Sequence, residues 1–166
     1  MATTAAAETR EKAAEGSLRW GSWLMGIAAA GLIGYAVVFL VRNFTDSFLE
    51  VGIGPNEVPV GKDAIQQFSP ELYHYVSHLH IAVSGFIAAT GLAVLFLVAY
   101  GVRRGELWAW AGAVAAPVLA LAVALPAHYP YNFDTLGHLG LIYLATVIFV
   151  AGALLALRGI IAQRRG

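Results

Sequence analysis

The sequence predicts an all-α integral membrane protein, a four-transmembrane-helix bundle with both termini in the cytoplasm. Of its 166 residues, 59% are hydrophobic and 12% are charged. A soluble domain carries roughly 25% charged residues, so this composition indicates a membrane protein. Four stretches reach the length of about 20 apolar residues that a membrane-spanning helix needs. The chain contains no Cys, which excludes disulfides and thiolate metal sites.

The first predicted span covers residues 20–41 and follows basic residues, as the apolar run of a secretory signal would. This run is longer than the about 7–15 residues of such a signal, so we expect a retained anchor. The residues before it, 1–17, are predicted to be a cytoplasmic N-terminal tail. Residues 18–166 are predicted to form a single transmembrane domain.

Residues 43–69 are predicted to be the only sizeable outer loop, because several glycines and prolines interrupt regular structure there. Ser69, Pro70 and Glu71 then supply a helix start: a capping hydroxyl, a proline at the first position and an acid in the first turn. The second predicted span, residues 71–100, is long for a bilayer. At about 1.5 Å per residue it reaches about 45 Å, against about 30 Å of hydrocarbon, so its first residues should lie at headgroup depth.

The third and fourth spans are predicted at residues 106–125 and 135–161. Pro117 is expected to kink the third helix and Pro126 to end it, because proline cannot donate to the helical hydrogen-bond ladder. Asp134 is expected to cap the fourth helix. Small residues in the first two spans predict close helix packing. They are Gly26, Ala30, Gly34, Ser84, Gly85, Ala88 and Ala89.

The distribution of Lys and Arg predicts the orientation of the bundle. Arg42 and Lys62 fall on one side of the predicted membrane layer. The other basic residues fall on the opposite side, and they are Arg10, Lys12, Arg19, Arg103, Arg104, Arg158, Arg164 and Arg165. Because basic residues concentrate in the cytoplasm, both termini should be cytoplasmic. We expect the chain to lie in a bacterial cytoplasmic membrane, with the loop of residues 43–69 outside.

All five histidines are predicted to lie near the outer edge of the membrane. Histidine is the side chain that titrates near neutral pH without help from its surroundings. Residues four apart share a helix face, as His74 and His78 do, and as Asp134 and His138 do. If the second span lies beside the fourth, these side chains could converge on copper or iron. The predicted metal ligands are His74, His78, His128, Asp134 and His138.

The pair Asp134 and His138 resembles part of the copper motif in the C subunit of particulate methane and ammonia monooxygenases. The resemblance implies a copper-ligating role for these two side chains. That family has a further histidine at the position of Ala151, so the resemblance is one of local ligand geometry and covers no more of the chain.

Three alternatives to a metal site remain open. Heme b could be held by His78 or His80 together with His138, since bis-histidine sites use ligands from two facing helices. A quinone headgroup could bind at the outer interface, with a histidine and Asp134 taking protons. The histidines could also be structural, because amphipathic side chains gather at headgroup depth for packing and hydrogen bonding.

The sequence contains no phosphate-binding Gly-rich loop, nucleophile elbow or His-Glu-x-x-His motif, so whether the chain is an enzyme stays open. Its few basic residues lie mostly on the predicted cytoplasmic side, as membrane topology requires, and this argues against nucleic-acid binding. Two functions are therefore predicted. One is a small redox or metal-binding membrane protein, and the other is a non-catalytic anchor or assembly subunit of a larger complex. Expected partners are the lipid bilayer and other membrane subunits or further copies of the chain.

Overall fold

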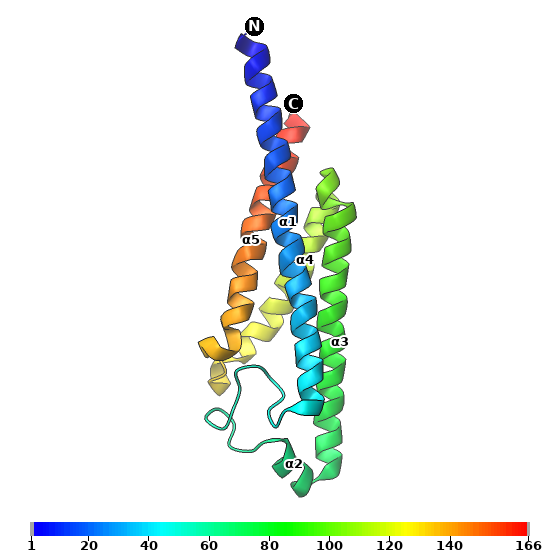
Figure 1. The fold of residues 1–166 in the computed structure, drawn as a ribbon, viewed down its shortest axis with the longest axis vertical. Coiled ribbons are helices and arrows are strands. Elements are labelled where there is room, and N and C mark those ends of the chain that lie inside the picture. Colours follow the sequence, from blue (N-terminus) through cyan, green and yellow to red (C-terminus); the bar gives the residue numbers. More distant parts are fainter. Residues whose placement is uncertain (1, 166) are drawn as a thin grey trace.

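The fold, seen in a computed structural model that describes residues 2–165 and their side chains from residue 8 onward, is all-helical (Figure 1). Within these residues, four helices are long and apolar enough to cross a membrane. They are α1 (Ala2–Thr45), α3 (Pro70–Tyr100), α4 (Leu107–Ala124) and α5 (Leu136–Arg165). The prediction of an all-α chain with four such helices is confirmed.

The first helix, α1, is much longer than the predicted span of residues 20–41. The residues expected to form a tail are helical from Ala2, since Ala, Glu, Lys and Arg all favour helix. At its other end α1 continues to Thr45, into the stretch expected to be loop. The rest of that stretch contains the short helix α2 (Lys62–Phe68).

The helix α1 lies at the centre of the arrangement of the four long helices. α1 packs along most of its length against α5 on one side and against α3 on the other (Figure 1). α4 follows α3 through the short turn η1 (Val102–Arg104) and contacts α3 more than α5. Convergence of the predicted ligands required the second and fourth spans, now α3 and α5, to lie side by side, but α1 lies between them.

Glycines set the close approach of α1 and α5. A Cβ added to Gly21 would collide with the backbone of Ala156, and one on Gly152 would lie 2.8 Å from the backbone N of Met25. Such small residues allow helix backbones to pack tightly in lipid. Of the small residues predicted to pack closely, Ser84 is buried and a Cβ on Gly26 would contact Leu95 of α3, whereas Ala30 is exposed and nothing lies within 4 Å of a Cβ added to Gly34.

The ends of the helices follow local sequence signals. Leu72 N–H donates to the Ser69 side chain at 3.1 Å and Pro70 opens α3, which confirms the predicted start. Thr135, rather than Asp134, caps α5, because its hydroxyl accepts from His138 N–H at 3.3 Å. Two short turns, η2 (Leu125–Ala127) and η3 (Tyr129–Tyr131), join α4 to α5.

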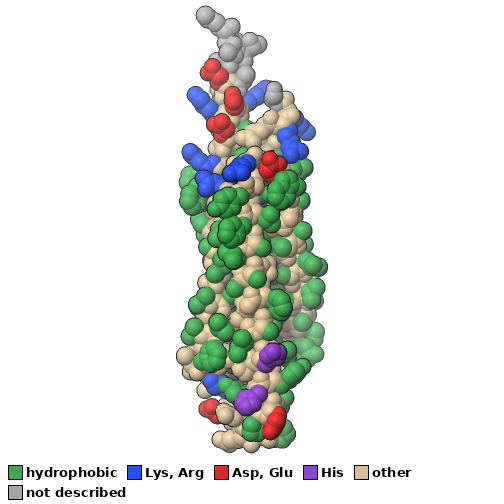
Figure 2. Space-filling model, turned by 90° about the vertical axis from the view of Figure 1, so that its right-hand side faces the viewer, with side chains coloured by type: hydrophobic (Ala, Val, Ile, Leu, Met, Phe, Trp, Pro, Cys, Tyr) green, Lys and Arg blue, Asp and Glu red, His purple; other side chains and the backbone are tan. Residues whose placement is uncertain are grey.

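Charged and apolar side chains occupy different zones along the molecule (Figure 2). Most Lys and Arg side chains gather at the end that carries both termini and the Arg103–Arg104 turn, called the basic end below. Exposed apolar side chains cover the middle, including Phe86, Phe96 and Leu119. This banding is typical of a chain that contacts hydrocarbon at its middle, and it suggests an integral membrane protein.

Candidate functional site at the histidine end

The five histidines lie at the end of the molecule opposite the basic end, which we call the histidine end, and Figure 2 shows histidine side chains on one face of it. This placement follows from the up-and-down course of the chain: α3 and α5 begin at this end, and α4 finishes there. The loop of residues 46–61 and α2 also lie there. The five side chains nevertheless occupy three separate environments.

His74 and His78 share one face of α3 and are both exposed. The ring of His74 lies 5.8 Å from that of Tyr73, measured between centroids. Neither histidine reaches α5, since α1 separates the two helices. The structure therefore does not bring the pair to Asp134 or His138, as the predicted metal site required.

His80 is buried in the interface between α1 and α3. Its Nε2 lies 2.8 Å from the backbone O of Phe39, and the two rings stack with centroids 3.7 Å apart. A carbonyl oxygen can only accept, so Nε2 carries the proton and donates. One turn further along α1, Asn43 donates to Ser77 of α3 at 2.9 Å. His80 therefore fastens α3 to α1, and it does not face His138 as an axial heme pair would.

His138 is buried at the start of α5, with 2% of its surface exposed. Its Nδ1 lies 2.7 Å from the backbone O of Val51 in the loop. The carbonyl can only accept, so Nδ1 donates, and in the neutral imidazole Nε2 then carries the lone pair. Nε2 makes no hydrogen bond among the described residues, yet it lies 3.3 Å from Oε2 of Glu50. In the neutral imidazole, two acceptor atoms thus face each other where the buried His138 meets the partly exposed Glu50.

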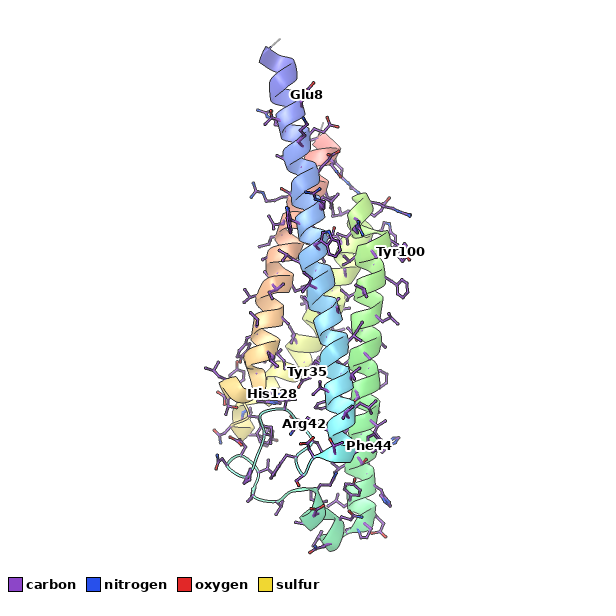
Figure 3. All side chains as sticks on the ribbon, in the orientation of Figure 1. Glu8, Tyr35, Arg42, Phe44, Tyr100 and His128 are labelled. Atoms are coloured by element: carbon purple, nitrogen blue, oxygen red, sulfur yellow. The ribbon has the colours of Figure 1, made fainter. Side chains whose placement is uncertain are left out.

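His128 lies beside His138, with ring centroids 5.1 Å apart. Its Nδ1 lies 2.9 Å from the backbone O of Ala124, so it too donates from Nδ1, and its neutral form carries the lone pair on Nε2. The side chain is partly exposed, as is that of Glu50. Figure 3 shows His128 at the histidine end, where Arg42 also lies. We call Glu50, His128 and His138 the Glu50 centre.

Glu50 is the residue that sequence reasoning missed, and Gly52 explains how it reaches α5. Gly52 has φ +75°, a left-handed conformation that glycine adopts without strain. A Cβ there would lie 2.6 Å from the backbone N of His138, so only glycine lets the loop rest on the first turn of α5. Arg42 also steadies the loop, since it donates to the backbone O of Phe48 at 3.0 Å and pairs with Asp46 at 3.5 Å. The sequence indicated a turn at Gly52, but it did not indicate that this turn packs against α5.

Asp134 is exposed and takes no part in the Glu50 centre. The predicted ligand set of His74, His78, His128, Asp134 and His138 is therefore divided, with only His128 and His138 together. In the conformation shown, no three or more His, Asp or Glu side chains of the described residues are arranged to hold a metal ion. The copper motif suggested by Asp134 and His138 thus has no counterpart in the geometry.

Fold and surface together define a class: an all-helical chain with four helices long and apolar enough to span a membrane, which suggests an integral membrane protein. Comparison of the chain with protein-family models, with curated proteins and with solved structures finds no match.

Proposed function

We propose that this chain is an integral membrane protein that binds a copper or iron ion at the Glu50 centre in a redox role. Both termini lie in the cytoplasm in this proposal, and the Glu50 centre lies at the outer face of a bacterial cytoplasmic membrane. The observation that carries the proposal is that His138 Nε2 makes no hydrogen bond among the described residues and lies 3.3 Å from Glu50 Oε2. When the imidazole is neutral, both atoms offer lone pairs that would attract a metal ion placed between them.

The distance between the two acceptor atoms fits a shared ion. Ligand atoms bound at about 2.0–2.2 Å to one tetrahedral ion lie about 3.3–3.6 Å apart. His138 Nε2 and Glu50 Oε2 are separated by 3.3 Å. His128 is partly exposed, so a rotation of its side chain could bring Nε2 to the same ion. That rotation would complete a set of two imidazoles and one carboxylate, a combination that suits iron and copper.

The hydrogen bonds made by the other ring nitrogen of each imidazole support the same conclusion. A histidine that ligates a metal almost always donates its other ring N–H to a carboxylate, a carbonyl or water, which fixes its tautomer. His138 donates to Val51 and His128 donates to Ala124, in both cases through Nδ1. In the neutral rings, these bonds therefore select the tautomer that leaves Nε2 free for a metal. His80, in contrast, uses its Nε2 to bind Phe39.

The positive-inside rule supports the orientation. The basic end carries Arg103, Arg104, Arg164 and Arg165. The histidine end carries only Arg42 and Lys62 among Lys and Arg.

Metal titration of the purified protein tests the proposal. Cobalt(II) is a suitable probe for iron, because its visible spectrum reports coordination, and copper(II) should be titrated in parallel. We expect a single high-affinity equivalent that is weakened at least about tenfold in His128→Ala and in Glu50→Gln. His78→Ala, an exposed histidine at the same end, is the matched control and should bind as the native chain does. Equal binding by all four proteins, or no binding by the native chain, would reject the proposal.

A second candidate function is a non-catalytic anchor or assembly subunit, and the exposed small residues of α1 favour it. Gly26, Ala30 and Gly34 are spaced by four on one helix, and the structure leaves Ala30 exposed and open space at Gly34. Such a row permits another helix to approach closely. The mass of the complex in mild detergent tests this role. A lone monomer, together with metal binding, would leave only the first proposal.

A further inference from the structure

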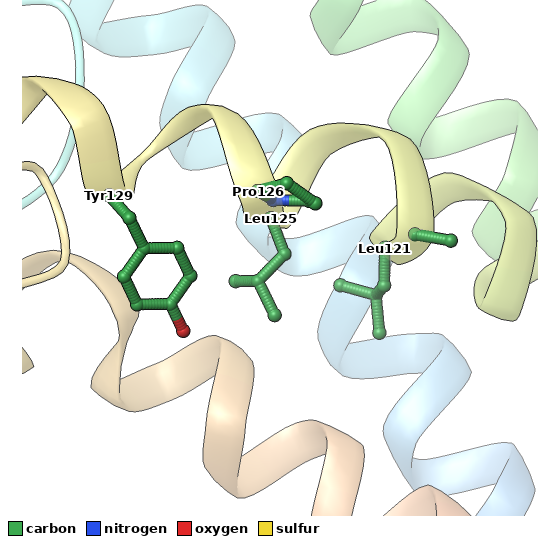
Figure 4. Close-up of a pocket in the computed structure, with 5 residues that line it drawn as sticks. Leu121, Leu125, Pro126 and Tyr129 are labelled. Carbon is green, nitrogen blue, oxygen red and sulfur yellow. The ribbon is translucent and has the colours of Figure 1, made fainter.

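Among the places on the described surface where a lipid could lie, two differ in what they can select. One is the open apolar hollow beside the last turn of α4 (Figure 4). It is lined by Leu121, Ala122, Leu125, Pro126 and Tyr129. No charged side chain belongs to this lining, so the hollow would accept the hydrocarbon of any lipid. The basic end, in contrast, presents arginines that could recognise a headgroup.

The turn η1 presents Arg103 and Arg104 on a fixed backbone. Val102 is buried beneath the turn, and its backbone O accepts from Gly105 N–H at 2.9 Å. Gly105 has φ +78°, a conformation that lets the chain reverse directly after the two arginines. The guanidinium of Arg103 lies over the ring of Trp23 on α1, 5.8 Å from its centroid, in a cation–π contact.

The C-terminal end of α5 lies against the same turn. A Cβ added to Gly105 would lie 2.9 Å from Gln163 Oε1, so the side chain of Gln163 rests on the turn. Ile160 belongs to the same buried cluster as Val102. Arg164 follows Ile160 by four residues and shares its helix face, which directs Arg164 toward the turn. We call the three basic residues of this region the arginine cluster: Arg103, Arg104 and Arg164.

The positive charge of the arginine cluster is not neutralised within the protein. All three side chains are exposed. No carboxylate among the described side chains forms an ion pair with any of them. Glu106, which directly follows the turn, is exposed as well and leaves the arginines in excess. The cluster can therefore attract an anion from outside the chain.

Exposed aromatic rings place the arginine cluster at the border of the apolar band. Tyr100 ends α3 just before the turn, and Trp108 lies in the first turn of α4 just after it; both rings are exposed, as is that of Trp23. Amphipathic rings of this kind lie at headgroup depth. The arginines between them are therefore at the depth of lipid phosphates, which favours a membrane lipid over a soluble anion.

We propose that the arginine cluster binds the phosphate of an anionic phospholipid headgroup. A guanidinium donates paired N–H bonds to phosphate oxygens, and the acyl chains would lie along the exposed apolar side chains of the middle of the molecule. A zwitterionic headgroup brings its own ammonium beside the arginines, so it should bind more weakly. This inference goes beyond the proposed function, because the site lies at the opposite end from the Glu50 centre and needs no metal.

Native mass spectrometry of the delipidated chain in detergent, titrated with phosphatidylglycerol or phosphatidylcholine, tests the inference. We expect the native chain to bind phosphatidylglycerol at least about fivefold more tightly than phosphatidylcholine. The double variant Arg103→Gln, Arg104→Gln should weaken phosphatidylglycerol binding at least about tenfold. Arg104→Gln alone, which leaves the contact with Trp23 intact, should weaken it about fivefold, and so should Arg164→Gln.

The matched control is the double variant Arg158→Gln, Arg165→Gln, which removes the same charge from the same end. Arg158 is two residues from Ile160, a rotation of about 200°, and Arg165 shares its face seven residues on. Both side chains are exposed and point away from the turn. The control should bind phosphatidylglycerol as the native chain does.

Three results would overturn the inference. The first is equal binding of the two lipids by the native chain. The second is an equal loss of binding in the two double variants, which would show only long-range attraction to the basic end. The third is displacement of phosphatidylglycerol by glycerol 3-phosphate at the same concentration, which would show that the cluster recognises a soluble phosphate.

Discussion

Replacement of a single glycine in the α1–α5 interface should separate the two central helices. In Gly152→Ala the new methyl would lie 2.8 Å from Leu24 Cβ, 2.8 Å from the backbone N of Met25 and 2.9 Å from the backbone O of Gly21. Two of these atoms belong to the α1 backbone, so they can yield only if the whole helix moves. Overpacking of this kind costs about 1–3 kcal/mol.

The cost of overpacking can be separated from the effect of helix propensity with a matched variant. This variant, Gly34→Ala, adds the same methyl to open space on α1. Both substitutions gain the helix propensity of Ala over Gly, about 1 kcal/mol. This gain cancels in the comparison, so Gly152→Ala should be less stable than Gly34→Ala by the overpacking cost of about 1–3 kcal/mol. Unfolding in mixed micelles of increasing dodecyl sulfate content, followed by circular dichroism, measures both. Equal stability of the two variants would refute the close packing of α1 on α5.

Three further predictions address the histidines and the orientation. His80→Ala removes a buried hydrogen bond and a ring contact, so it should lower the free energy of unfolding by about 1–3 kcal/mol. The control His74→Ala changes an exposed side chain and should alter this free energy by no more than about 0.5 kcal/mol. At about pH 8, where imidazole is ordinarily neutral, metal-free Glu50→Gln should be at least as stable as the native chain, because its amide can donate to the facing histidine nitrogen. Single cysteines are clean reporters in a chain without Cys, so Asn56→Cys should react with an impermeant maleimide in intact cells and Arg104→Cys only after permeabilisation.

Each of these predictions has a contrary result. A stability of the His80 variant equal to that of the His74 variant would remove the proposed link between α3 and α1. A clear loss of stability in metal-free Glu50→Gln would show that the carboxylate is satisfied in some other way. Labelling of Arg104→Cys in intact cells would invert the proposed orientation.

The four spans were predictable because hydrocarbon thickness sets the length of an apolar helix, and that length is legible in a sequence. The α3 start was predictable too, since Ser69 and Pro70 act on the backbone within a single turn. The order of helices around α1 was not predictable. Lipid and neighbouring helices are both apolar, so hydropathy does not distinguish a face that meets one from a face that meets the other.

In the candidate site, too, features set by neighbouring residues could be predicted, whereas contacts between distant segments could not. That all histidines share one end follows from counting spans. Which of them meet depends on α1 lying between α3 and α5, and on a loop that Gly52 lets rest against His138. Glu50 was overlooked because nothing near it in sequence identifies its partner. The α5 cap was misplaced by one residue, since Asp134 and Thr135 are both good capping residues and tertiary contacts decide between them.

The unbroken length of α1 has a mechanical consequence. With 44 residues at about 1.5 Å each, the helix measures about 66 Å, roughly twice the hydrocarbon thickness. A continuous helix behaves as a stiff lever, and this one touches both neighbouring long helices before ending at the loop that carries Glu50. A tilt imposed on its N-terminal turns would therefore displace the far tip, and with it the carboxylate opposite His138. Events on one side of the bilayer would reach the other through a single piece of secondary structure.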